Sequence, residues 1–348
     1  MENISDKIYL SKVKYKKIST KKKNDIYFLI IIIIIQLILN LYFILNRKKG
    51  PCKEKNYSLN TISLNNNIVN DNDNKKEQNY FNKEKFEEID VNIFLPIQKK
   101  IEGLIEETLD EQKFLNGIIR KFKPKKILEL GVSAGGSSAL ILNAIKDLPE
   151  SKLYSIDRVE KWYLNKAKNV GWVVNEKFPE LLDKWKLFAG KNPSEFIETI
   201  GNNIDLALID TKHLCPGEML NWLEVLPFLK EEALVVFHDA FLMFSKSYYE
   251  HGKKKIFSNN LLLSYIRGEL ILPLYGNETF SRNIGAIKLE KNQHNFYIHY
   301  FMALGNQWEY SPDERDLRIL KKYFKKYYGE KYVEIFDDAI NQNKNKHW

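Results

Sequence analysis

The sequence predicts an α/β protein with a doubly wound, mostly parallel sheet of seven strands, preceded by a transmembrane helix near the N-terminus. Short apolar runs alternate with segments of helical periodicity between residues 126 and 289, which is typical of a parallel sheet with helices on both faces. These apolar runs are nearly continuous, as in strands that are buried on both faces. A separate apolar segment of twenty residues precedes this region, at residues 26–45.

The first 82 residues divide into three segments. Residues 1–25 form a basic tail, residues 26–45 form the expected transmembrane helix, and residues 46–82 form a flexible stalk rich in Asn, Lys and Ser. At about 1.5 Å per residue, the apolar segment crosses a hydrocarbon core of about 30 Å. A cleaved secretory signal is the alternative. The segment is too long for one, begins too late, and is not followed by a small-residue cleavage site.

The formal net charge of +9 comes from the N-terminal segments. Residues 1–60 hold thirteen Lys or Arg and four acids, which accounts for the whole excess. Basic residues beside an apolar segment favour a membrane surface, and the neutral remainder of the chain argues against nucleic acid as a partner. The two cysteines, Cys52 and Cys215, lie far apart, so neither a disulfide framework nor a cysteine zinc site is expected.

Residues 83–299 form the expected domain, which begins with helical periodicity that ends at Pro124. Strands are expected at residues 127–130, 153–157, 185–190, 204–210, 233–239, 270–274 and 284–289. Helices are expected between them at residues 139–146, 160–169, 216–230 and 256–267, with a short helix that begins at Pro193. Residues 300–348 form a helical extension that packs on the domain or on a second copy of the chain, as in a homodimer. A lid rich in aromatic residues is the alternative.

A glycine-rich turn joins the first strand to the next helix. It reads E-x-G-x-x-x-G-G, with Glu129 at the strand end, Gly131 in the turn and Gly135 at the helix start. The phosphate-binding pattern G-x-x-x-x-G-K-[ST] is absent, and so is the dinucleotide pattern G-x-G-x-x-G. Glycine permits close backbone approach, and the unpaired N–H groups of a helix start favour an anion. The turn is therefore expected to hold the charged end of a nucleotide-like cofactor.

Acids end four of the expected strands. Glu129, Asp157, Asp210 and Asp239 fall at the carboxyl ends of the first, second, fourth and fifth strands. Ligands of open α/β sheets bind beyond these ends. His213 follows the fourth strand and is the first candidate for a general base, because an unperturbed imidazole titrates near pH 6.5. A histidine of a surface loop is the alternative.

The run from residue 109 to residue 239 resembles the class I S-adenosylmethionine (SAM) methyltransferases. It is most similar to the catechol and caffeoyl-CoA O-methyltransferase group and its bacterial relatives. The similarity lies in residues 109–115 before residues 125–131, in residues 205–210 with His213, and in residues 235–239. The resemblance implies a Rossmann-like methyltransferase fold, SAM as cofactor, and methylation of a hydroxyl group.

The resemblance also implies roles for single residues in holding the cofactor. The residues expected at the methionine end of SAM are Glu129, Gly131, Ser133, Gly135 and Ser137. The hydroxyl of Ser137 would donate to the cofactor carboxylate. Asp157 would accept hydrogen bonds from both ribose hydroxyls, since a carboxylate offers two acceptor oxygens.

The expected catalytic residues are His213, Asp210 and Asp239, and the two acids are also the expected ligands of a divalent cation such as Mg²⁺. His238 is interpreted as a packed, hydrogen-bonded core histidine. The chain departs from the family in two places. Ala240 stands where a further Asn or Asp is common, and Lys191 follows the third strand where the family usually has an acid near the adenine.

The sequence thus predicts a single-pass membrane protein that methylates a hydroxyl group of a sugar, a glycan or a small molecule. Seven lysines precede the apolar segment closely and five Lys or Arg follow it, which favours the domain outside. The cytoplasmic supply of SAM favours the domain inside, and we prefer the cytoplasmic placement. A non-catalytic membrane-tethered module, which Ala240 and Lys191 favour, and a nicotinamide oxidoreductase are the alternatives.

Overall fold

The computed structural model describes residues 84–240, 249–250, 253–274 and 283–344. The expected tail, transmembrane helix and stalk of residues 1–82 lie outside these ranges. Within them, no helix has both the length and the apolar character that a membrane span requires. The described residues belong to one compact unit, Lys76–Trp348.

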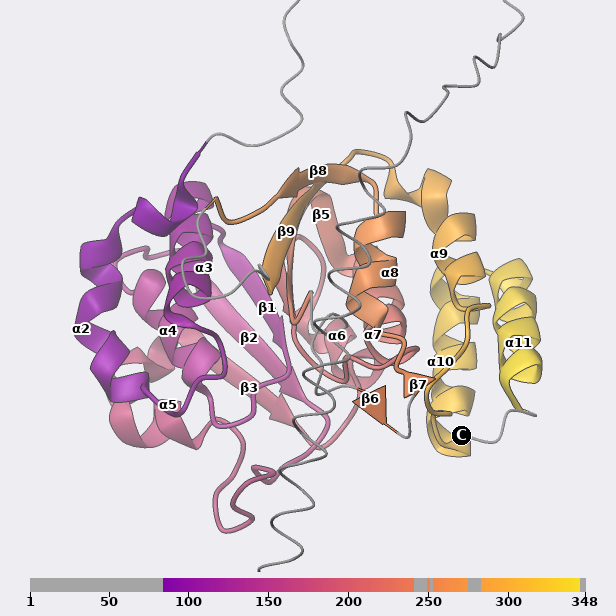
Figure 1. The fold of residues 1–348 in the computed structure, drawn as a ribbon, viewed down its shortest axis with the longest axis horizontal. Coiled ribbons are helices and arrows are strands. Elements are labelled where there is room, and N and C mark those ends of the chain that lie inside the picture. The colour runs from indigo at the N-terminus through magenta and orange to yellow at the C-terminus, as the bar shows by residue number, and fades with distance from the viewer. Residues whose placement is uncertain (1–83, 241–248, 251–252, 275–282, 345–348) are drawn as a thin grey trace, which may run out of the picture. The chain divides into compact units, whose positions relative to one another are not determined.

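A seven-stranded sheet lies at the centre of this unit, with the strand order β3-β2-β1-β4-β5-β9-β8 (Figure 1). Its strands are β1 Lys126–Leu130, β2 Lys152–Asp157, β3 Trp185–Ala189, β4 Ile204–Ile209, β5 Leu229–His238, β8 Gly268–Ile271 and β9 Ile284–Leu289. A second, two-stranded sheet pairs β6 Tyr249–Glu250 with β7 Lys253–Lys254. The strands fall within a few residues of the predicted ranges.

The prediction of a mostly parallel sheet needs a correction, because the sheet is mixed. The four pairings among β1 to β5 are parallel, whereas β9 runs antiparallel to both of its neighbours, β5 and β8. No helix is described between β8 and β9, and strands that are joined without a helical crossover pair antiparallel. The parallel half is the part that carries the acids at its carboxyl edge.

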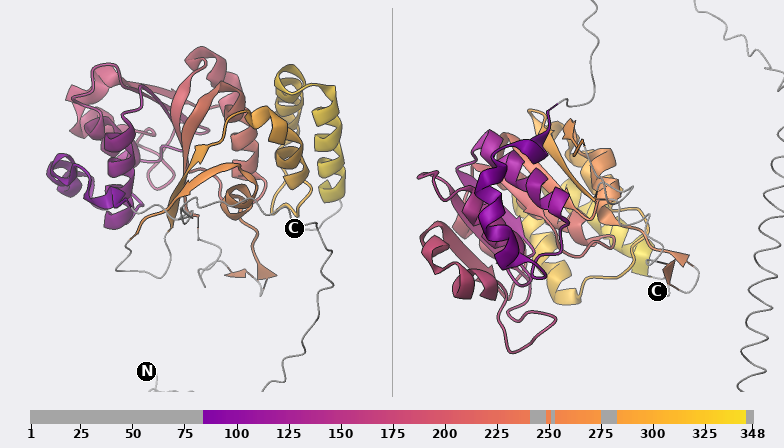
Figure 2. Two further views of the ribbon diagram at one scale, coloured as in Figure 1. Left: turned by 90° about the horizontal axis from the view of Figure 1, so that it is seen from above. Right: turned by 60° about the vertical axis from the view of Figure 1, so that its left-hand side comes forward.

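Helices cover both faces of the sheet, so the doubly wound arrangement is confirmed (Figure 2). One face is covered by α2 Val91–Ile101, α3 Leu109–Phe122, α4 Gly136–Ala144 and α5 Trp172–Lys177. The other is covered by α6 Pro193–Ile200, α7 Gly217–Val225, α8 Ser258–Tyr265, α9 Tyr297–Ala303, α10 Glu314–Tyr327 and α11 Glu330–Lys344. In β4, Leu206 and Leu208 face the first layer while Ala207 and Ile209 face the second, which is the alternation of a strand between two cores.

The prediction of a helix at residues 160–169 is wrong, because this segment is an irregular loop. Lys161 and Asn169 form an isolated antiparallel bridge, and the Asn165 side chain accepts a hydrogen bond from the Ala167 N–H. Such a side-chain bond offers the backbone an alternative to helical pairing. The loop returns to the glycine turn, where the Gly171 N–H donates to the Ser133 carbonyl.

The C-terminal extension packs on the second face through aromatic side chains. The Tyr328 hydroxyl donates to the Leu223 carbonyl at 2.6 Å, and that of Tyr323 donates to the Glu224 carbonyl. Both carbonyls belong to α7, close to its C-terminal end, where backbone acceptors lack helical partners. The extension is therefore part of the same unit as the sheet, and Tyr310, Pro312 and Asp316 lie close to the carboxyl edge of the parallel strands.

Candidate active site

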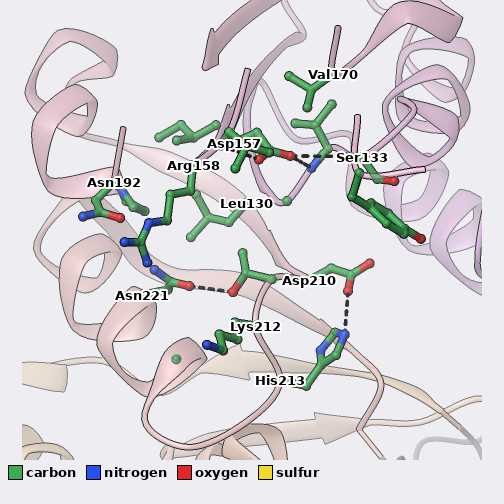
Figure 3. A pocket seen from close by; sticks show the side chains of 18 of the residues that line it. Leu130, Ser133, Asp157, Arg158, Val170, Asn192, Asp210, Lys212, His213 and Asn221 are labelled. Atoms are coloured by element: carbon green, nitrogen blue, oxygen red, sulfur yellow. Dashed lines mark hydrogen bonds and ion pairs between the residues drawn. The ribbon is translucent and has the colours of Figure 1, made fainter. Parts of the chain in front are cut away.

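A cavity of about 600 Å³ opens at the carboxyl ends of β1, β2 and β4 (Figure 3). Pockets of this size hold small molecules and cofactors. Six of the predicted site residues line it: Gly131, Ser133, Ser137, Asp157, Asp210 and His213. The other three, Glu129, Gly135 and Asp239, lie outside the lining.

The glycine turn brings two strand ends together. Gly131 has a positive φ of 87°, and a Cβ on it would lie 1.7 Å from the Asp210 carbonyl oxygen. Gly135 also has a positive φ, and a Cβ on it would lie 2.8 Å from the Gly171 Cα. Gly131 thus allows the turn to approach β4, whereas Gly135 seats the helix start against the segment that leads into α5. Gly135 acts on the cavity through the backbone rather than by lining it.

Glu129 lies beneath the turn and not in the cavity. It is fully buried, and its carboxylate accepts hydrogen bonds from Ser137 at 2.7 Å, Ser138 at 2.6 Å and Ser155 at 2.5 Å. Burial raises the pKa of Glu129 to about 7, although the three hydroxyls oppose that shift. The single O–H of Ser137 is used by this bond, although Ser137 also lines the cavity. The direct contacts of Glu129 and Ser137 with the cofactor stay predictions. Glu129 fixes the first turn of α4.

Asp157 both lines the cavity and holds the turn. One carboxylate oxygen accepts from the N–H groups of Val132 at 3.0 Å and Ser133 at 3.2 Å, and the other accepts from Val159 N–H at 3.0 Å. A carboxylate has about four acceptor positions, so one remains for a ligand hydroxyl. The predicted position of Asp157 is correct, and its link to the turn is additional.

His213 is placed between carboxylates. Its Nε2 lies 2.9 Å from Asp239 Oδ2 and 3.9 Å from Asp210 Oδ1, while its Nδ1 lies 3.2 Å from Glu218 Oε1. Burial alone would lower its pKa, but the hydrogen bonds with Asp239 and Glu218 raise the pKa to about 11. His213 is therefore an imidazolium in this arrangement, and a free imidazole nitrogen for proton abstraction is absent from it. Figure 3 shows the Asp210 carboxylate and the His213 ring at the same end of the cavity.

His238 is buried, as expected of a core histidine, but it is not hydrogen-bonded in the ordinary way. It is 3% exposed, and neither ring nitrogen has a well-formed hydrogen bond within the described part of the chain. Nδ1 lies 3.4 Å from Asp210 Oδ2, and Nε2 lies 3.6 Å from Glu111 Oε2. Burial opposes its charge, yet the nearby Asp210 carboxylate raises its pKa well above the ordinary value.

These groups have the donor set for a divalent cation, with His238 beside the two predicted ligands, Asp210 and Asp239. One ligand atom each from Asp210, His238 and Asp239 lies within 4.8 Å of the others, and the same holds for Asp210, His213 and Glu218. The unpaired nitrogens of His238 are the sign of fit, since a buried polar atom normally has a partner.

Several cavity residues were not foreseen. Glu106 and Glu107 precede α3, and the Tyr163 hydroxyl donates to Glu106 at 2.5 Å across the cavity rim. Glu107 is 5% exposed, its Oε1 has no partner among the described residues, and burial raises its pKa to about 7. Residues of the C-terminal extension complete the far end: Tyr310, Pro312, Asp316 and Leu320. No sequence motif marks the extension residues. Glu106 and Glu107 could have been noticed because they precede a capping box at Thr108.

A glycine turn, an acid after the second strand and a cavity over the carboxyl edge of a doubly wound sheet form the kind of site that the sequence resemblance predicts. Residues 128–240, about a third of the chain, match a family model described as a methyltransferase domain. The predicted resemblance to methyltransferases is confirmed by this match. No curated protein sequence matches the chain.

Solved methyltransferase structures are similar to part of the chain. The O-methyltransferase TomG of Streptomyces achromogenes, solved with SAM and involved in tomaymycin synthesis, is 16% identical over 57% of this chain and 89% of its own, with a TM-score of 0.41. The methyltransferase PaMTH1 of Podospora anserina is 14% identical over 57% and 88%, with a TM-score of 0.41. An O-methyltransferase of Bacillus cereus is 11% identical over 57% and 91%, with a TM-score of 0.41.

Proposed function

We propose that this protein is a membrane-anchored SAM-dependent O-methyltransferase that acts on a hydroxyl group. One observation carries the proposal: a single cavity joins the start of α4 and the Gly131 turn to Asp157 and to the neighbouring side chains of Asp210 and His213. The start of α4 with the Gly131 turn suits the charged amino acid end of SAM, and Asp157 suits its ribose. Asp210 and His213 are suited to proton transfer beside the cofactor.

The chain's own groups account for cofactor binding. No side chain caps the start of α4 in the described structure, so its N–H groups are available to the methionine carboxylate. The remaining acceptor position of Asp157 suits a ribose hydroxyl. Glu107, buried at the same end and without a partner for Oε1, suits the cationic amino group. SAM supplies an electrophilic methyl group on a sulfonium.

Asp210 is the group that we assign to proton removal. Methyl transfer to a hydroxyl needs an acceptor oxygen in line with the methyl group, and a base for its proton. Both nitrogens of His213 already engage carboxylates, whereas Asp210 faces the cavity. The Asp210 carboxylate takes the hydroxyl proton, and the His213 cation beside it stabilises the negative charge that develops on the oxygen. Asp239 acts by holding His213.

In a cation-bound form, a divalent cation would be held by Asp210, Asp239 and His238, and Asp210 would then act as a ligand and not as the base. Bound there, the cation would lower the pKa of an acceptor hydroxyl. Imidazole ligands suit ions such as Mn²⁺ or Zn²⁺, whereas Mg²⁺ prefers oxygen ligands. The preference for Mn²⁺ or Zn²⁺ over Mg²⁺ follows from the imidazole nitrogen of His238.

The cellular setting is proposed from the sequence. Residues 26–45 anchor the protein as a single membrane-spanning helix, and the domain faces the cytoplasm, where SAM is available. The acceptor is a sugar, a glycan or a small molecule, and nucleic acid is not a partner. Self-association through the C-terminal extension is a further expectation of the sequence.

Titration calorimetry of the full chain in detergent micelles tests the proposal. We expect SAM to bind at one site per chain. In a separate assay with methyl-labelled SAM, we expect the label to appear in extracted lipids, glycans or small phenols. A folded protein that does not bind SAM would instead support the non-catalytic module. Quenching or enhancement of NADH fluorescence on mixing would favour the oxidoreductase.

A further inference from the structure

We propose that Asp316, in the C-terminal extension, recognises the 6-amino group of the cofactor's adenine. The inference rests on the proposed SAM site and assigns its nucleoside end. The third strand lacks the acid that the sequence resemblance leads one to expect there, because Lys191 follows Gly190. Asp316 supplies a carboxylate at this place from a segment outside the matched methyltransferase domain.

The direction of the cavity determines where a base would lie. The Gly131 turn and the start of α4 take the amino acid end, and Asp157 takes the ribose. Beyond Asp157, the cavity continues past Arg158 to Asn192, which follows β3, and to Asn221 on α7 (Figure 3). This end of the described lining offers a place for the base when the amino acid lies at the turn and the ribose at Asp157.

Asp316 lies in the wall of this end in a fixed position. It is 3% exposed, and it belongs to the first turn of α10, where its N–H donates to the capping residue Asp313 at 2.8 Å. Asn192 Nδ2 donates to Asp316 Oδ1 at 2.8 Å, and Arg158 lies 2.6 Å from Oδ2. Arg315 Nη1 also donates to Oδ1 at 3.4 Å, so one of about four acceptor positions remains on the carboxylate. A buried carboxylate with unused acceptor capacity suits an amino group and rejects an oxo group.

The surroundings also suit a planar base. Leu220 on α7 and Leu320 on α10 are nearly buried and line the same end. The Arg158 guanidinium is held by Asp313 and Asp316, and a fixed planar guanidinium can stack on a ring. Apolar walls with a few fixed polar groups are the usual composition of a specific small-molecule site.

Titration calorimetry with two ligands tests the proposal on the full chain in detergent micelles. The ligands are S-adenosylhomocysteine and S-inosylhomocysteine, which carries an oxo group in place of the amino group. We expect the wild type to prefer the adenosyl ligand by about tenfold or more, since a buried acceptor facing an oxo group is left unpaired. In Asp316→Asn, whose amide can donate to the oxo group, the preference should fall to within about threefold.

Glu314→Gln, on the same helix, is the control. Glu314 is exposed, pairs only loosely with Arg318 at 3.9 Å and lies outside the cavity lining. It should keep the wild-type preference. An unchanged preference in a folded Asp316→Asn protein would overturn the inference and leave the SAM proposal intact. Equal binding of the two ligands by the wild type would also overturn the inference and leave the SAM proposal intact. Failure of the wild type to bind either ligand would contradict both the inference and the SAM proposal.

Discussion

The two ends of the cavity differ in the way they carry charge. At the methyl-transfer end, carboxylates and imidazoles lie within hydrogen-bond or ion-pair distance of one another and are largely buried: Asp210, His213, Glu218, His238 and Asp239. At the nucleoside end, cations and amides meet two buried acids, Asp316 and Glu224, beside a tyrosine. Burying many ionisable groups together is costly unless they are paired, and such clusters concentrate at functional sites.

This difference in charge predicts that one end of the cavity determines the rate of methyl transfer and that the other end recognises the cofactor. Changes at the ionisable end should alter proton transfer and leave cofactor affinity nearly unchanged. Changes at the nucleoside end should alter affinity or base preference and leave the chemical step nearly unchanged. The following predictions test this separation, beginning with the largest effect.

Asp210→Asn should lower the rate of methyl transfer by about 10²–10⁴-fold, the usual contribution of a general base. The amide keeps the shape of the side chain but cannot take a proton. SAM affinity should stay within about threefold of the wild type. Single-turnover transfer of labelled methyl groups measures the rate, and calorimetry measures the affinity.

Asp183→Asn provides the control for Asp210→Asn, because Asp183 is exposed and lies outside the cavity lining. Its rate should equal that of the wild type. A large loss of SAM affinity in Asp210→Asn, with the rate per bound cofactor unchanged, would contradict the separation of the two ends.

Glu129 should make the stability of the domain depend on pH. Its pKa is about 7 in the folded protein, against about 4.5 in an unfolded chain, so the folded state binds more protons between these values. The free energy of unfolding should therefore fall as pH rises from about 4.5 to about 7, by up to about 3 kcal/mol. Denaturant unfolding at several pH values, compared with Glu129→Gln, measures this contribution.

The difference between wild type and Glu129→Gln should thus shrink or reverse with rising pH, because Gln has no proton to lose. Glu176→Gln, at an exposed ion pair with Lys168, should show no such trend. A pH-independent difference would mean that the pKa of Glu129 is the same in the folded and the unfolded protein.

Metal binding should favour Mn²⁺ over Mg²⁺ by about tenfold, because His238 adds a nitrogen ligand to the two aspartates. The electron paramagnetic resonance signal of free Mn²⁺ reports binding without any turnover. His238→Phe should remove the preference while the two carboxylates remain. Equal affinity for both ions in the wild type would show that His238 is not a ligand.

The parts of the site that adjacent segments build could be predicted from the sequence. Gly131, Ser133 and Asp157 lie where the strand-turn-helix pattern placed them, because the carboxyl ends of parallel strands share one edge. Side-chain partners were harder to foresee. Glu129 has the expected position at a strand end, yet three serine hydroxyls around it turn it into a buried support.

The far wall of the cavity could not be predicted, since Asp316 contacts Asn192 across 124 residues of sequence. Helical periodicity indicated that residues around Leu320 form a helix, but it does not say which surface the helix covers. The protonation of His213 depends on Glu218 and Asp239 together, which only the packed structure brings to the two ring nitrogens.

Lys212→Met should produce the smallest effect and therefore tests the nucleoside end most finely. Lys212 Nζ lies 3.3 Å from the centre of the Tyr310 ring, and burial and the nearby Arg158 both lower its pKa. The pair should stabilise the fold by about 0.5–1 kcal/mol, the usual size of an exposed cation–π contact. Tyr310→Phe, which keeps the ring, should be nearly neutral for this contact. SAM affinity should change by no more than about threefold, because an uncharged base gives the lysine no anion to bind. A loss of tenfold or more in affinity would place an anionic group of the ligand beside Lys212, and the division between an ionisable end and a base-recognising end would then be wrong.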